Sequence, residues 1–173
     1  MIANKIPAIH TPRLTLRTIT ESDDARLIAT LKNPEVGLTY MVPDLPTRAD
    51  EERILARFVQ LSADPRRFLY GIYREEELIG FLNDVETTED SIELGLVIHP
   101  DHKGRGYATE ALTAAMEVLF DMGYAVVKTG VFEENLASRR VMEKSGMTQI
   151  DLRDQLEYRG KTHTCVWFEK RRA

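Results

Sequence analysis

The strongest constraint on the fold is a change of hydrophobic period in the middle of the chain. From residue 68 the period is two, which predicts strands over residues 68–73, 78–85 and 91–98, joined by short turns at 74–77 and 86–90. Apolar residues then recur every three or four positions from Ala108 to Phe120, which predicts a long helix ended by Gly123. Strands with such short turns form an antiparallel meander. The helix then carries the chain, in the right-handed sense, to a further strand at 125–132.

The flanking segments add strands and helices on both sides of this central unit. A strand is predicted over residues 13–19. Two helices follow, opened by capping patterns at Thr20 and Thr47, and the first ends before Pro34. Residues 36–46 are expected to form a loop. The pattern also predicts a helix over residues 135–144 and strands over 147–158 and 161–168, joined at Arg159 and Gly160. Because no composition break interrupts the chain, we expect one α+β domain over residues 1–173.

Composition narrows the classes of partner. Lys and Arg total 23 and Asp and Glu total 28, a net charge of −5, which argues against a dedicated nucleic-acid binder. The single cysteine, Cys165, rules out an internal disulfide framework and a multi-cysteine metal site, and it fits a reducing compartment. The sequence shows neither a secretory signal nor eighteen consecutive apolar residues. We therefore expect a cytoplasmic monomer or homodimer with no nucleic acid, membrane or metal as partner.

A glycine-bearing loop between a strand and the long helix is the clearest candidate site. Gly104 and Gly106 let the backbone approach a ligand closely, the helix start offers free N–H groups, and Lys103 and Arg105 add positive charge. These features indicate a phosphate or pyrophosphate site, whereas an ordinary strand-to-helix turn is equally supported by the glycines alone. The P-loop pattern is absent, and the dinucleotide fingerprint fails because Thr109 occupies its final position.

Four segments, in order along the chain, resemble one family. Residues 103–108 resemble the acetyl-CoA pyrophosphate loop of the GNAT superfamily of N-acetyltransferases, Arg/Gln-x-x-Gly-x-Gly/Ala, with Lys103 in place of its first residue. Residues 107–112 and 11–17 are similar to the branch that includes the ribosomal-protein N-acetyltransferases (RimJ/RimL-like). Residues 135–147 resemble its second signature, with Met147 where Phe is commoner. The resemblance implies a mixed, mostly antiparallel sheet of six to seven strands flanked by about four helices.

The resemblance also implies a reaction: transfer of an acetyl group from acetyl-CoA to a primary amine, by direct attack on the thioester and without a metal. The pantetheine arm would lie along the strand before the glycine loop, whose amides polarise the thioester carbonyl. Gly95 in that strand suggests a bulge or a close ligand approach. The residues expected to bind the cofactor are Leu96, Val97, Ile98, Lys103, Gly104, Arg105, Gly106, Tyr107, Ala108, Asn135, Ser138, Arg139 and Lys144.

Two carboxylates are candidate general bases by this carry-over, Glu93 in the same strand and Glu157 in the penultimate strand, each acting directly or through water. Ser138 is a candidate for protonating the leaving sulfur, because Met142 matches the position where the superfamily usually has a tyrosine acid. Tyr40 and Tyr158 remain alternative acids.

The acceptor pocket should be lined by the loop at 36–46, through Tyr40, Met41 and Leu45. Asp44 is the lone charge there, which favours a protein N-terminal α-amine or a small apolar-bearing amine over a polycation. Amino acids and antibiotic amines remain open.

Two other interpretations have to be weighed. Cys165 alternates with apolar residues beside His163, a pattern more typical of a core cysteine than of a nucleophile, and covalent catalysis is not expected. The missing tyrosine leaves a second class open, a non-catalytic acyl-CoA-binding or sensor module. Release of free thiol from acetyl-CoA in the presence of amines distinguishes the two classes.

Overall fold

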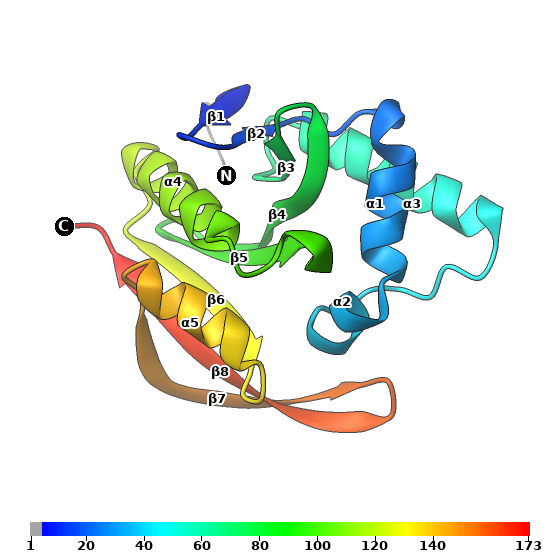
Figure 1. Ribbon diagram of the computed structural model, residues 1–173. Helices are drawn as coiled ribbons and strands as arrows, with labels where there is room; N and C mark the ends of the chain where they lie inside the picture. Colours follow the sequence, from blue (N-terminus) through cyan, green and yellow to red (C-terminus); the bar gives the residue numbers. More distant parts are fainter. Residues whose placement is uncertain (1–4) are drawn as a thin grey trace.

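The computed structural model describes residues 5–173, and over this range eight strands form one sheet in the order β1-β2-β3-β4-β5-β6-β8-β7 (Figure 1). All neighbours pair antiparallel except β5 and β6, which are parallel. The predicted α+β, mostly antiparallel sheet is therefore confirmed. The strands are β1 (Ala8–His10), β2 (Thr15–Arg17), β3 (Tyr70–Arg74), β4 (Glu77–Thr87), β5 (Ser91–Ile98), β6 (Val126–Phe132), β7 (Thr148–Tyr158) and β8 (Lys161–Arg171).

The strand count exceeds the predicted six to seven because of β1. Its three residues pair with β2, and Ile9 lies opposite Leu16 in the core. A strand this short shows too few alternations to reveal a period, so the sequence pattern missed it.

Helices cover both faces of the sheet. They are α1 (Asp24–Lys32), α2 (Pro34–Thr39), α3 (Arg48–Ala63), α4 (Tyr107–Asp121) and α5 (Leu136–Lys144), with short 3₁₀ turns η1 (Glu21–Asp23) and η2 (Pro100–His102). Two apolar cores result. Ile92, Leu94 and Ile98 of β5 pack in the core that contains the apolar residues of α4, whereas Val97 packs in the core that contains those of α1. No helix within residues 5–173 has both the length and the apolar character needed to cross a membrane.

The segment predicted as a loop over residues 36–46 begins as a helix, α2. The side chain of Asn33 accepts a hydrogen bond from the Glu35 N–H at 3.0 Å, and Pro34 occupies the first turn. Proline is well suited to a first helical turn, because its missing N–H would be unbonded there in any case. Pro34 therefore ends α1, as predicted, and also starts α2.

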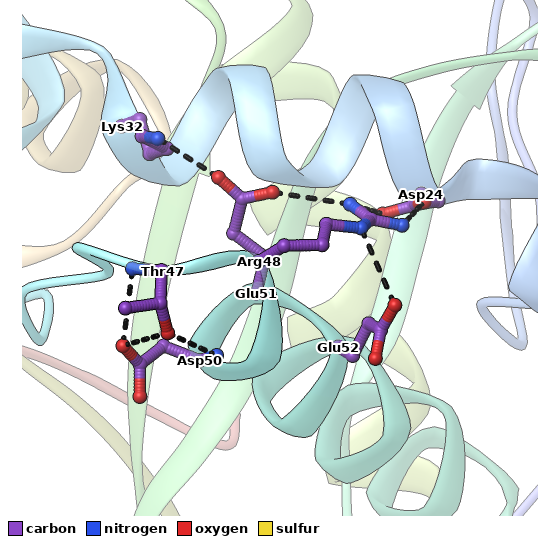
Figure 2. A network of polar contacts seen from close by, with 7 residues as sticks. All are labelled: Asp24, Lys32, Thr47, Arg48, Asp50, Glu51 and Glu52. Atoms are coloured by element: carbon purple, nitrogen blue, oxygen red, sulfur yellow. Dashed lines mark hydrogen bonds and ion pairs between the residues drawn. The ribbon is translucent and has the colours of Figure 1, made fainter.

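The beginning of α3 is fixed by a capping box and by charged contacts to α1, shown in Figure 2. Thr47 and Asp50 bond reciprocally: the Thr47 Oγ1 accepts from the Asp50 N–H at 3.2 Å, and the Asp50 carboxylate accepts from the Thr47 N–H at 3.1 Å. Arg48 contacts both Asp24 of α1 and Glu51 of α3, and Glu51 also accepts from Lys32 at 2.8 Å. These ion pairs link α3 to α1, but the Arg48 side chain is 55% exposed, so each pair contributes little to the free energy of unfolding.

Replacing the capping residue tests this account of α3. Thr47→Ala should lower the free energy of unfolding by about 1 kcal/mol, because the Asp50 N–H loses its side-chain acceptor. Urea denaturation measures the change. Thr47→Ser keeps the hydroxyl and should stay close to the parent protein; equal stability of the Ala variant would contradict the role of the cap.

Candidate active site

The sheet opens between β5 and β6. Their parallel pairing covers Ser91 to Glu93 against Val126 to Lys128 and then stops. β5 stays paired with β4 up to Ile98, and β6 stays paired with β8 up to Phe132. The two strands separate as they leave this pairing (Figure 1). Beyond this pairing, towards Ile98, β5 therefore has one edge that pairs with no strand of residues 5–173.

A cleft of about 690 Å³ occupies this opening. Its walls come from α2, β5, the glycine loop, the start of α4, β6, α5 and the β7–β8 hairpin. Most of the residues singled out from the sequence line it: Tyr40, Met41, Glu93, Leu96, Val97, Ile98, Lys103, Gly104, Gly106, Tyr107, Ala108, Asn135, Ser138 and Lys144.

Five of the singled-out residues do not line the cleft: Leu45, Arg105, Arg139, Glu157 and Tyr158. Leu45 is buried in the core with the α1 residues. The Arg139 guanidinium bonds instead to the Glu133 carbonyl at 3.2 Å and to Gln149 at 3.4 Å. Glu157 is exposed, and its neighbour Leu156 lines the cleft, as expected when successive strand residues face opposite ways. Arg105 lies in the loop with its side chain exposed.

The glycine loop leaves the start of α4 open to a ligand. Gly104 and Gly106 have φ of +74° and +81°, values that other residues rarely adopt. Gly106 is the N-cap residue, and no side chain of residues 5–173 caps the helix, so the first N–H groups of α4 have no side-chain acceptor within that range. A Cβ at Gly104 would meet no atom of residues 5–173 within 4 Å. With Lys103 on the rim, this open, positively polarised turn fits a phosphate or pyrophosphate group.

The side chains of Asn83 and Tyr40 explain why position 95 is a glycine. A Cβ there would lie 2.9 Å from Asn83 Oδ1 and 3.3 Å from the Tyr40 ring, and the Tyr40 hydroxyl donates to Asn83 at 2.8 Å. The irregularity expected near Gly95 lies instead in β4, between Asp84 and Thr87. Burial raises the pKa of Tyr40 to about 12, so its phenol stays protonated at neutral pH.

Glu93 has the electrostatic environment of a base. Burial raises the pKa of its carboxyl, and the charges of Glu86 and Asp154 raise it further against the opposing charge of Lys128. Asp154 also lines the cleft, and its carboxylate accepts a hydrogen bond from the Trp167 indole at 2.8 Å. The sequence pattern did not reveal Asp154, because only strand register brings it to this wall.

The two remaining candidate acids, Ser138 and Tyr158, differ in their hydrogen-bond partners. The Asn135 amide donates to the Ser138 Oγ at 2.8 Å, and the Ser138 hydroxyl hydrogen has no acceptor among residues 5–173, so it is free to donate. The Tyr158 hydroxyl instead donates to the Gly37 carbonyl at 2.8 Å and accepts from Arg159 at 2.8 Å. Tyr158 thus joins the β7–β8 hairpin to α2 and is not positioned as an acid.

Cys165 lines the cleft as a protonated thiol. Burial raises its pKa, and the nearby carboxylates of Asp154 and Glu93 raise it further. His163 does not activate it, because the ring bonds to Glu134 at 2.6 Å and stacks on Phe132 with centroids 4.2 Å apart. A protonated thiol is a weak nucleophile.

Comparison with known proteins identifies the family. Residues 13–148 match the family described as Acetyltransferase (GNAT) domain. The Bacillus subtilis protein YoaA, named an uncharacterized N-acetyltransferase, is 28% identical over 161 residues, covering 90% of this chain and 91% of YoaA.

Two acetyltransferases are among the solved structures that share the fold. One is the Salmonella typhimurium acetyltransferase that modifies the N-terminal serine of the 50S ribosomal subunit protein L7/L12, with a TM-score of 0.81, 18% identity and coverage of 96% and 99% of the two chains. The other is RimL, a ribosomal L7/L12 α-N-protein acetyltransferase in complex with coenzyme A, with a TM-score of 0.79, 18% identity and coverage of 95% and 97%. Together with the family match, these findings confirm the prediction of an acetyltransferase: the chain belongs to the GNAT acetyltransferase family.

Proposed function

We propose that this chain, acting as a single N-acetyltransferase domain, transfers an acetyl group from acetyl-CoA to a primary amine by direct attack on the thioester. The observation that carries the proposal is the layout of the cleft. An uncapped helix start with two left-handed glycines lies at one wall, and an unpaired strand edge leads from there to a carboxylate of raised pKa, Glu93.

The donor end has the groups that acetyl-CoA requires. Pyrophosphate would bind the first N–H groups of α4 beside Lys103, with Lys144 and Arg140 as further cationic residues of the cleft. The free edge of β5 at residues 96–98 would bond to the pantetheine amides. The thioester supplies the activated acetyl group, and these strand amides are suited to stabilise charge on its carbonyl oxygen.

The acceptor end has the groups that amine attack requires. The amine must be neutral, and an α-amine, with an ordinary pKa of about 7.7–8.0, reaches that form far more easily than a lysine side chain at about 10.4. Glu93 accepts the amine proton, directly or through water, and the free hydroxyl hydrogen of Ser138 is available to the leaving sulfur.

The acceptor that fits best is a protein N-terminal α-amine or a small amine carrying apolar groups. Tyr40 and Met41 give this part of the wall an apolar surface, while Glu93 and Asp154 supply negative charge for an incoming ammonium group. The Salmonella protein that shares the fold acts on an N-terminal serine, which supports a terminal amine. We propose a cytoplasmic location for this reaction.

A thiol-release assay tests the function. The purified protein mixed with acetyl-CoA and a panel of peptides with free N-termini, small amines and polyamines should release CoA with at least one amine. The acetylated product is then identified by mass. Tight CoA binding with no turnover on any acceptor would favour the non-catalytic sensor instead.

A further inference from the structure

The turn between β1 and β2 lies against the start of α4, although almost a hundred residues separate them in sequence. The turn is closed by the Thr11 N–H, which donates to the Leu14 carbonyl at 2.9 Å, and by the Leu14 N–H, which donates to the Thr11 hydroxyl at 2.9 Å. Arg13 lies within this turn and does not line the cleft.

Arg13 is tied to Glu110, a residue of the first turn of α4. Its backbone N–H donates to one carboxylate oxygen at 2.9 Å, and its guanidinium contacts the other through Nε and Nη2, both at 2.7 Å. Thr11 adds a hydroxyl bond to the same carboxylate at 2.8 Å. Both oxygens of the Glu110 carboxylate are thus held by Arg13, one by its backbone N–H and the other by its guanidinium, which fixes the direction of the side chain as well as its distance. Because Glu110 neutralises the Arg13 charge, long-range attraction of phosphate is not the main effect of Arg13.

The rest of the guanidinium holds the glycine loop. Nη1 donates to the Arg105 carbonyl at 2.9 Å, and the guanidinium lies over the Tyr107 ring, 4.6 Å from its centroid. Arg13 therefore contacts the residues on both sides of Gly106. In a trans peptide the C=O of one residue and the N–H of the next point in opposite directions. With the Arg105 carbonyl held toward Arg13, the Gly106 N–H must point away from Arg13.

We propose that Arg13 is a positioning residue of the acetyl-CoA site: anchored on Glu110, it holds the Arg105–Gly106 peptide so that the loop is already arranged for the pyrophosphate before the ligand binds. This inference rests on the proposed function of the loop. Without Arg13 the loop must be ordered at the moment of binding, and that cost reduces affinity.

Calorimetric titration with CoA, together with acetyl-CoA kinetics, tests the proposal. Arg13→Ala should weaken CoA binding roughly tenfold and raise the KM for acetyl-CoA similarly, with kcat at saturation nearly unchanged. Arg13→Lys should be impaired as well, because a single ammonium cannot bond to Glu110 and to the Arg105 carbonyl in the same fork geometry. Glu110→Gln should weaken binding to a smaller extent.

Arg17→Ala is the matched control. Arg17 is the last residue of β2, in the same hairpin, and its guanidinium lies 3.5 Å from the centroid of the Tyr73 ring. It contacts no residue of the glycine loop. It should bind CoA like the parent protein. Arg13→Lys retains the charge, and a thermal unfolding curve checks that the variant is folded. If the folded variant binds CoA with parent affinity, the positioning role is overturned. If the parent protein itself does not bind CoA, the proposed function fails instead.

Discussion

Gly104→Trp should abolish measurable CoA binding, a loss of at least about 100-fold in affinity. Gly104 lines the cleft beside the start of α4, and a Cβ there would meet no atom of the described part of the chain within 4 Å. A large side chain can therefore be added without a clash inside the protein, and it would occupy the space proposed for the pyrophosphate. Calorimetry with CoA measures the loss.

The left-handed backbone at Gly104 makes a control necessary, because any other residue there is strained by roughly 1–2 kcal/mol. Gly123→Trp provides it. Gly123 follows the opposite end of α4 and has φ of +108°. A Cβ at this position would likewise meet no described atom within 4 Å, but Gly123 does not line the cleft. The variant should keep parent affinity at a similar cost in stability. Parent affinity in the Gly104 variant would place the phosphate site elsewhere.

Glu93→Gln should lower kcat roughly 100-fold without a comparable change in CoA affinity, because the amide cannot accept the amine proton. In the parent protein the acid limb of the pH–rate profile should lie above the ordinary carboxyl range, because burial, with Glu86 and Asp154, raises the pKa of Glu93. The variant should lose the part of that limb that comes from Glu93 and keep the part that comes from protonation of the amine. Steady-state rates between pH 5 and 9 give both results.

The Glu93→Gln variant is expected to lose activity but not thermal stability. A carboxyl whose pKa is higher in the folded state binds protons more tightly there. The contribution of Glu93 to the free energy of unfolding therefore decreases as the pH rises from its ordinary pKa of 4.5 through its raised pKa in the folded protein. The Gln variant lacks this loss, so its Tm at neutral pH should not fall below that of the parent.

Glu157→Gln is the control for the base. Glu157 is exposed on β7 and does not line the cleft, so its removal should leave kcat and the pH profile unchanged. A slowed Glu157 variant together with an unaffected Glu93 variant would overturn the assignment of Glu93.

Local sequence patterns predicted those strands and helices whose characteristic spacing of residues lies within the element itself. The strand at 91–98, the glycine loop and the long helix were all expected, because alternation, left-handed glycines and helical periodicity depend on neighbours a few residues away. The β1 strand and α2 were missed for reasons of length: three and six residues hold too little of either period. The two-residue turn at Arg159 and Gly160, with φ of +50° and +73°, was also readable locally.

The order of the elements, the phosphate-type loop and the family resemblance all follow from the amino-acid sequence, since each depends on short spacings along the chain. Which side chains share the cleft was decided by tertiary contacts. A register shift in β7 between Ile150 and Arg153 sets Asp154 opposite Cys165 on the cleft wall, while Glu157 is exposed and does not line the cleft. The Arg13–Glu110 contact likewise joins residues 97 apart. Register and packing arise from contacts between distant segments, and a local pattern holds no record of which segments meet.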